Sequence, residues 1–337
     1  MAGIRTSPKT RVLVASGRLE SPDVQKAVWS RTVVSVARNY GEFRAMAGDT
    51  EVLLLWDFES QMMLSQLWSS FRQLKWIHLG SVGADRILFP ELIRSSVIVT
   101  NSGDIPFRDN AIAEYAMGLV FLYAKDFLKT VELQAARRWE PRYTTNVAGA
   151  SLLVVGFGPI GRAVARMARR CSMRVTALSR GGRSGTAADG FAVKPVTQLL
   201  DAICDADFVV LALPETPETT GLINKRVFEH MRRSAVLINI GRGANVVEAD
   251  LMEALRQGLI AGVAADAFVE EPLPPTNPLW TAPNALVSPH MCGDFHGWET
   301  VQFDLFVKNL RRWVYRRPLK NVLDKRLGYV SRLAIAT

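Results

Sequence analysis

The stretch SLLVVGFGPIGRAVARMARRCSMRVTALSR, residues 151–180, decides the fold of the chain around it. An apolar run leads into Gly156, Gly158 and Gly161, spaced G-x-G-x-x-G, and a helical pattern and a second apolar run follow. In such a β-α-β unit the glycines allow a tight turn, a close approach of the backbone to a pyrophosphate, and close packing of helix on strand. The helix then directs free N–H groups at the phosphates. The stretch therefore predicts a dinucleotide-binding site.

The end of the second apolar run indicates which dinucleotide binds. NAD-binding units carry an acid about 20 residues beyond the glycines, where it binds the ribose hydroxyls. Here the run ends in Ser179 and Arg180, Arg183 follows, and the first acid is Asp189. A hydroxyl and a guanidinium suit a 2′-phosphate, which arginine can bind bidentately. We predict that NADP is preferred. The alternative is that Arg180 is an exposed loop cation and that the protein uses either NADP or NAD.

Apolar runs alternate with helical patterns along most of the chain, which is typical of parallel sheets covered on both faces. A helical pattern over 107–130 separates two series of runs, and another over 301–317 follows the second series. We predict an α/β protein of two Rossmann-like domains with parallel sheets and a substrate cleft between them. Residues 1–106 plus 291–337 form the substrate-binding domain, and residues 107–290 the dinucleotide-binding domain. The runs are residues 11–16, 51–56, 75–80 and 96–100, then 151–156, 174–179, 207–214, 235–240, 260–265 and 285–289.

Composition narrows the class of protein. A chain of 337 residues, 48% hydrophobic, is long enough for two domains with sizeable cores. The net charge of +9 comes from scattered Lys and Arg with no zinc-finger or RNA-binding motif, so we expect no nucleic-acid partner. The longest apolar run, 115–124, is too short to span a bilayer, and the N-terminus has no apolar signal core. Three widely spaced cysteines predict no metal site and a reducing, cytoplasmic location.

Four further motifs follow the glycine loop in order. They read LALPETPETTGLINKRVFEHM, AVLINIGRGANVVEADLMEAL, AGVAADAFVEEPLP and ALVSPHMCGD. With the loop, this series resembles the D-isomer-specific 2-hydroxyacid dehydrogenase family, in its glyoxylate/hydroxypyruvate reductase branch, over about residues 75–310. The resemblance implies an NAD(P)-dependent oxidoreductase that reduces a small 2-oxo acid to the D-2-hydroxy acid. It also implies a homodimer formed mainly through the cofactor domain.

The resemblance assigns a catalytic trio to Arg242 in INIGRG, Glu271 in VEEP and His290 in SPH, with Glu270 as the neighbouring alternative acid. The chemistry asks for these residue types independently. A histidine can protonate the carbonyl oxygen as hydride reaches carbon. A carboxylate orients the imidazole and favours its charged form, and a guanidinium binds the substrate carboxylate. Arg242 and His290 each follow an apolar run, which places them at strand carboxyl ends, where open α/β sheets bind ligands.

Other contacts follow from the same resemblance. In HLGSVGADRIL, the backbone N–H groups of Val82 and Gly83 would hold the substrate carboxylate. Asp266 corresponds to the contact for the nicotinamide carboxamide, and Leu213 and Pro214 would line the adenosine side. The full predicted cofactor set is Gly156, Gly158, Pro159, Ile160, Gly161, Ser179, Arg180, Leu213, Pro214, Ile240 and Asp266.

The sequence leaves the substrate open. The segment MCGDFHGW after the histidine departs from the small-residue run common in the family, so Phe295 and Trp298 are expected to reshape the pocket. Trp56 and Trp139 are further candidates for lining the cleft, against the default of a core or interface tryptophan. One alternative function is an NAD-linked D-2-hydroxyacid or phosphoglycerate dehydrogenase. The other is a non-catalytic, dinucleotide-sensing regulatory protein of the same fold.

Overall fold

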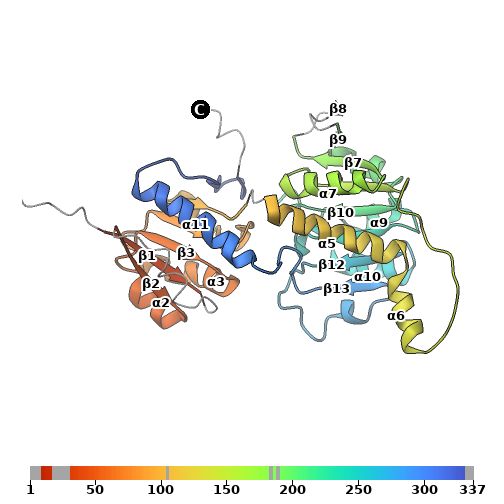
Figure 1. The fold of residues 1–337 in the computed structure, drawn as a ribbon, viewed down its shortest axis with the longest axis horizontal. Helices are drawn as coiled ribbons and strands as arrows, with labels where there is room; N and C mark the ends of the chain where they lie inside the picture. The colour runs from red at the N-terminus through yellow and green to blue at the C-terminus, as the bar shows by residue number, and fades with distance from the viewer. Residues whose placement is uncertain (1–8, 17–30, 104–105, 182–184, 187–189, 331–337) are drawn as a thin grey trace, which may run out of the picture. The chain divides into compact units, whose positions relative to one another are not determined.

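A computed structural model gives the fold as two compact units, each built on a largely parallel sheet covered by helices (Figure 1). This confirms the predicted fold class. Unit 1 comprises Met1–Ile105 and His296–Thr337, and unit 2 comprises Pro106–Phe295. These limits differ from the predicted domain boundaries by one residue and by five, and the binding role of each domain stays a prediction. The structure describes residues 9–16, 31–103, 106–181, 185–186 and 190–330, so Arg183 and Asp189 lie outside it.

The sheet of unit 1 has five parallel strands in the order β2-β1-β3-β4-β5. Buried leucines on one face pack with α2, α3 and α4, while Val12 and Val14 on the other face pack with Phe306 and Leu310 of α11. Helix α11 therefore covers the sheet of the chain's first part, although it lies near the C-terminus (Figure 1). The elements are β1 Thr10–Ala15, β2 Thr32–Ala37, α2 Tyr40–Met46, β3 Val52–Leu55, α3 Phe58–Leu67, β4 Trp76–Leu79, α4 Pro90–Arg94, β5 Ile98–Thr100 and α11 Trp298–Val314.

A fully buried histidine lies on an interior strand of this sheet. His78 on β4 is 0% exposed, and its Nδ1 lies 2.7 Å from Oγ1 of Thr100. Burial lowers the pKa of His78 from 6.5 to about 3. Between these two pH values the unfolded chain binds a proton that the folded chain does not, so the free energy of unfolding falls as the pH drops.

We expect His78→Asn to reduce this acid sensitivity. Well between the two pKa values, one buried histidine lowers the free energy of unfolding by about 1.4 kcal/mol for each unit by which the pH falls. The measurement is the urea unfolding of the whole chain at pH 6 and pH 5, followed by tryptophan fluorescence. The exposed His230 provides the control, because His230→Asn should keep the wild-type slope. Equal slopes for all three proteins would exclude His78 as the source.

The sheet of unit 2 has eight strands in the order β13-β12-β11-β10-β6-β7-β9-β8, parallel except for the β8–β9 pair. From β6 the chain proceeds outward through β7, and it later returns to place β10 on the other side of β6. The carboxyl ends of β6 and β10 therefore form a topological switch point, where ligands of such sheets bind. The strands are β6 Ser151–Val155, β7 Arg174–Ser179, β8 Gly185–Thr186, β9 Ala192–Pro195, β10 Phe208–Leu211, β11 Val236–Asn239, β12 Gly262–Ala265 and β13 Ala285–Val287.

Helices cover both faces of this sheet. Buried side chains of α5 and α7 form a core with one face, and those of α8, α9 and α10 form a core with the other (Figure 1). None of the described helices in either unit is long and apolar enough to cross a membrane. The helices of unit 2 are α5 Pro106–Ala124, α6 Phe127–Ala135, α7 Pro159–Arg170, α8 Leu199–Ile203, α9 Lys225–His230 and α10 Glu248–Arg256.

The single helix predicted over 107–130 is wrong, because the chain breaks between α5 and α6. Asp126 adopts a left-handed conformation at φ 50, and the guanidinium of Arg142 donates to its carboxylate and to its carbonyl oxygen. No glycine or proline marks this point in the sequence. The break is stabilised by an ion pair with a residue sixteen positions away, which local periodicity does not reveal.

Candidate active site

The glycine loop joins β6 to α7 at the switch point. A Cβ at Gly156, whose φ is +103, would lie 2.4 Å from the carbonyl oxygen of Ala212, and one at Gly161 would lie 1.9 Å from the carbonyl oxygen of Gly156. These two glycines are therefore required by packing. A Cβ at Gly158 would meet nothing within 4 Å, and Gly158 is the N-cap of α7, with Pro159 following it. The open space in front of a helix N-terminus fits a pyrophosphate.

The other predicted cofactor residues lie at neighbouring strand ends of the same sheet. Ser179 is the last residue of β7 and Arg180 follows it, exposed. Leu213 follows β10, and its Cδ2 lies 3.1 Å from the position of a Cβ on Gly156. Ile240 follows β11 and is 6% exposed. The fold thus brings these side chains together at the carboxyl ends of the strands.

An acid that the sequence did not single out lies near Arg180. A hydrogen bond with Thr216 and the charge of Arg180 lower the pKa of Glu218. Glu218 belongs to the loop after β10, so its proximity to the end of β7 is a product of strand order. The cation that we predict to bind a 2′-phosphate therefore has a carboxylate in its electrostatic neighbourhood.

The histidine and one of the two adjacent glutamates form a direct contact. Nδ1 of His290 lies 3.0 Å from both Oε1 and Oε2 of Glu271, and the backbone N–H of Phe268 donates to Oε1 at 2.9 Å. The two side chains are 22% and 13% exposed. Glu270 is exposed, so the geometry selects Glu271 as the partner of the imidazole.

The backbone around His290 is held by a buried carboxylate. His290 has a φ of 53, a left-handed conformation that costs about 1–2 kcal/mol for a residue with a Cβ. Asp266, 1% exposed, accepts hydrogen bonds from the Ser288 hydroxyl at 2.7 Å and from the N–H groups of Met291 at 3.0 Å and Cys292 at 2.9 Å. It therefore fixes the chain on both sides of the histidine. Its contact with a nicotinamide carboxamide stays a prediction.

Arg242 lies on a turn that packs against the loop of the acid. The N–H of Arg242 donates to Oδ1 of Asn245 at 2.9 Å, and Nδ2 of Asn239 donates to the Arg242 carbonyl oxygen at 2.9 Å. A Cβ at Gly243 would lie 2.0 Å from the carbonyl carbon of Phe268, so this backbone approach requires glycine. Because Phe268 also donates to Glu271, the turn and the acid are held against each other.

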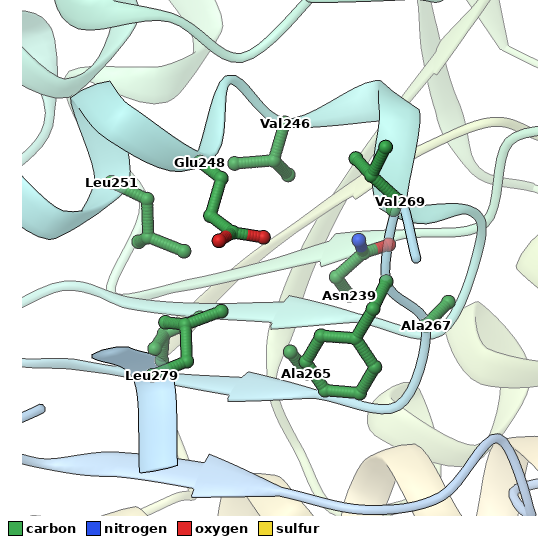
Figure 2. Close-up of a pocket in the computed structure, with 11 residues that line it drawn as sticks. Asn239, Val246, Glu248, Leu251, Ala265, Ala267, Val269 and Leu279 are labelled. Carbon is green, nitrogen blue, oxygen red and sulfur yellow. The ribbon is translucent and has the colours of Figure 1, made fainter. Parts of the chain in front are cut away.

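A small pocket lies beside these two loops on the α10 side of the sheet (Figure 2). Its lining is almost entirely apolar, with Val246, Leu251, Ala265 and Leu279 among the side chains shown. The one carboxylate there, Glu248, accepts a hydrogen bond from the Asn277 amide at 2.7 Å. We interpret this pocket as a packing void and assign no ligand to it.

In unit 1 the predicted substrate loop follows β4. The carbonyl oxygens of Val82 and Gly83 accept hydrogen bonds from Asn101 Nδ2 at 2.6 Å and from Ser81 Oγ at 2.8 Å. The N–H groups of Val82 and Gly83 donate to no other residue in the described part of the chain. This loop therefore has its carbonyl groups fixed and its donors available, as an anion site needs.

The tryptophans that the sequence left open differ in environment. Trp56 is 5% exposed and stacks on Trp298 within unit 1, with ring centroids 5.9 Å apart. Trp139 is 94% exposed on the segment after α6. Trp56 and Trp298 are thus part of the packing of unit 1, and Trp139 lies on the surface of unit 2.

Comparisons with known proteins agree with the predicted family. The family model described as D-isomer specific 2-hydroxyacid dehydrogenase, NAD binding domain, matches residues 117–292. The glyoxylate reductase of Thermococcus kodakarensis is 32% identical over 260 residues, which cover 74% of this chain and 77% of that protein. Glyoxylate/hydroxypyruvate reductase A of Serratia proteamaculans is 31% identical over 224 residues, which cover 65% of this chain and 71% of that protein.

Solved structures give the same result. A D-isomer specific 2-hydroxyacid dehydrogenase family protein from Aeromonas salmonicida has a TM-score of 0.83 at 28% identity, covering 95% of this chain and 100% of that one. An NADPH-dependent glyoxylate/hydroxypyruvate reductase from Sinorhizobium meliloti, in complex with NADP and sulfate, has a TM-score of 0.83 at 25% identity and the same coverage. The chain belongs to the D-isomer specific 2-hydroxyacid dehydrogenase family of oxidoreductases, in its glyoxylate/hydroxypyruvate reductase branch.

Proposed function

We propose that this enzyme reduces a small 2-oxo acid of the glyoxylate or hydroxypyruvate type to the D-2-hydroxy acid. The observation that carries the proposal is the 3.0 Å contact of His290 Nδ1 with both oxygens of Glu271. With Nδ1–H donating to the carboxylate, Nε2 is the ring nitrogen that can carry the transferred proton. The nicotinamide supplies the hydride when bound.

Each residue of the trio then has one task. His290 protonates the carbonyl oxygen of the substrate, and Glu271 holds the imidazole in the required tautomer. Arg242 binds the substrate carboxylate through its planar fork of N–H groups. In unit 1, the N–H groups of Val82 and Gly83 suit a carboxylate. Turnover of a panel of 2-oxo acids, followed by the absorbance of the reduced nicotinamide, tests the whole assignment; no turnover of any of them would contradict it.

We also propose NADP as the preferred cofactor and NAD as the alternative. Ser179 and Arg180 at the end of β7 support this proposal, because their side chains suit a 2′-phosphate and no acid occupies the end of that strand. The S. meliloti relative, which is named as NADPH-dependent, is consistent with it. Assays of the panel with NADPH and with NADH decide between the two.

The role of Arg242 can be separated from general damage by one substitution. Arg242→Lys keeps the charge but loses bidentate binding, so we expect kcat/KM for 2-oxo acids to fall by about ten- to a hundredfold, the loss of one charged hydrogen bond. Cofactor affinity and melting temperature should change little. The control is Arg256→Lys on α10, where the exposed arginine pairs with Glu253. If an oxamate-like ligand binds Arg242→Lys as tightly as wild type, the carboxylate role is wrong.

Two further expectations stay proposals. We propose a homodimer, supported by large exposed apolar side chains on α6 and after it, including Val131 at 64%, Trp139 at 94% and Tyr143 at 104%. Exposed apolar side chains of this size are typical of a contact surface, and the mass measured by light scattering tests the proposed dimer. A cytoplasmic location is supported by the free thiols of Cys171 and Cys204, and cell fractionation tests that.

A further inference from the structure

A second arginine of unit 2 has no role in the reaction described above. Arg108 lies in the first turn of α5, and its Nε and Nη1 are buried with no hydrogen-bond partner among the described residues. Burial lowers the pKa of Arg108, the nearby carboxylate of Asp294 opposes this, and the charge of Arg242 adds to the lowering. Buried guanidinium N–H groups that have no hydrogen-bond acceptor destabilise the fold, unless a bound ligand provides the acceptor.

The contacts of α5 place Arg108 near the carboxyl ends of the strands. Near the end of α5, the Tyr123 hydroxyl donates to the carbonyl oxygens of Val263 and Asn284, at the amino ends of β12 and β13. Earlier in the helix, the side chain of Tyr115 lies beside that of Ser288, just beyond the carboxyl end of β13. The first turn of α5 therefore lies at the carboxyl ends of the strands, where His290 and Arg242 also lie.

The guanidinium packs directly on the segment that follows the histidine. A Cβ at Gly293 would lie 3.0 Å from Nε and 3.4 Å from Nη2 of Arg108. Gly293 is three residues beyond His290, and the N–H groups between them are fixed by Asp266. Arg108 thus packs against the hydrogen-bonded backbone that follows His290. Because residue 293 is a glycine, the guanidinium has room there.

Arg108 and Arg242 are close enough to repel each other. A negatively charged group between the two guanidinium groups would therefore be favourable. The acids near Arg108 are Asp294, which is exposed, and Asp109. Neither of them accepts a hydrogen bond from the buried Nε or Nη1. Under the proposed function Arg242 binds the carboxylate of the 2-oxo acid, and a second acidic group on the same substrate would accept hydrogen bonds from Arg108.

We propose that Arg108 determines specificity by binding a second acidic group of the substrate, so that the enzyme prefers 2-oxo dicarboxylic acids to monocarboxylic ones. This inference rests on the proposed function, because it names the substrate class of the same site. Matched pairs test it: oxaloacetate against 2-oxobutyrate, and mesoxalate against pyruvate. In each pair a methyl group replaces the second carboxylate.

We expect wild-type kcat/KM to be about ten- to a hundredfold higher for the dicarboxylate of each pair, as for one charged hydrogen bond. Arg108→Met should abolish this preference and leave glyoxylate and 2-oxobutyrate turnover within about twofold, since their only carboxylate binds Arg242. The control is Arg170→Met, at the exposed C-terminal end of α7, away from the carboxyl ends of the strands. It makes the same charge change and should preserve the preference.

A measurement without turnover distinguishes binding from structure. D-malate should raise the melting temperature of the wild-type enzyme with NADP more than D-2-hydroxybutyrate does, and this difference should vanish in Arg108→Met. The unliganded variant should be as stable as wild type or more so, because it lacks an unpaired buried charge. A marked loss of stability with unchanged selectivity would show a structural role and overturn the inference.

The remaining outcomes separate the two proposals. If glyoxylate is reduced but the dicarboxylate preference is absent, or survives Arg108→Met, the role of Arg108 is wrong and the proposed function stands. An equal loss for both members of each pair would mean that Arg108 binds the shared carboxylate, which also overturns the specificity role. If no 2-oxo acid is reduced, both proposals are wrong.

Discussion

Replacing His290 by alanine is expected to lower kcat for 2-oxo acid reduction by about two to four orders of magnitude, the usual contribution of a positioned general acid. The imidazole is the group whose Nδ1 contacts both oxygens of Glu271, and alanine leaves no proton donor in its place. Cofactor affinity should be nearly unchanged, because the glycine loop is untouched. The measurement is kcat at saturating 2-oxo acid, with the affinity for NADPH obtained separately by fluorescence titration.

Three further variants make this result specific. His290→Asn also removes the acid but tolerates the left-handed conformation at φ 53 better than most residues, so its kcat should be equally low without loss of stability. His230→Ala, at the exposed end of α9, should behave as wild type. Glu271→Gln keeps the shape but not the charge, and about a ten- to hundredfold loss of kcat is expected. Near-normal turnover of His290→Ala would rule out the proton-donor role.

The second large effect concerns the cofactor. We expect wild-type kcat/KM to favour NADPH over NADH by about ten- to a hundredfold, the contribution of a charged hydrogen bond from Arg180 to the 2′-phosphate. Arg180→Asp should invert this preference, because a carboxylate repels the phosphate and can bind the ribose hydroxyls instead. Both cofactors are compared at a fixed 2-oxo acid concentration and low salt, where charge effects are least screened.

The structure supplies the controls for this experiment. Arg174→Asp makes the same charge change at the exposed start of β7, the far end of the strand from Arg180, and should leave the preference intact. Glu218→Gln removes the acid near Arg180 and should strengthen the preference modestly, because exposed charge pairs are screened by water. Equal use of both cofactors by the wild type, or a preference that survives Arg180→Asp, would contradict the NADP proposal and leave the dehydrogenase assignment unaffected.

The sequence by itself determined the features that depend on local pattern. The apolar runs predicted most of the parallel strands, since a strand buried on both faces must be apolar throughout. The spacing of Gly156, Gly158 and Gly161 between an apolar run and a helical pattern predicted the phosphate loop, because this spacing can be recognised within one short segment. Strand β2, Thr32–Ala37, was missed, and its partly exposed, mixed sequence gives a weaker signal.

Only the tertiary structure decided which distant groups meet. It brought Glu271, which the motif had already favoured over Glu270, into contact with His290, and it placed Glu218 near Arg180. It also seated Arg108 on Gly293, 185 residues further along the chain. Each of these contacts depends on strand order and on the path of a helix across the sheet. Such contacts leave no periodicity in the sequence, because they join segments that are neighbours only after the chain has folded.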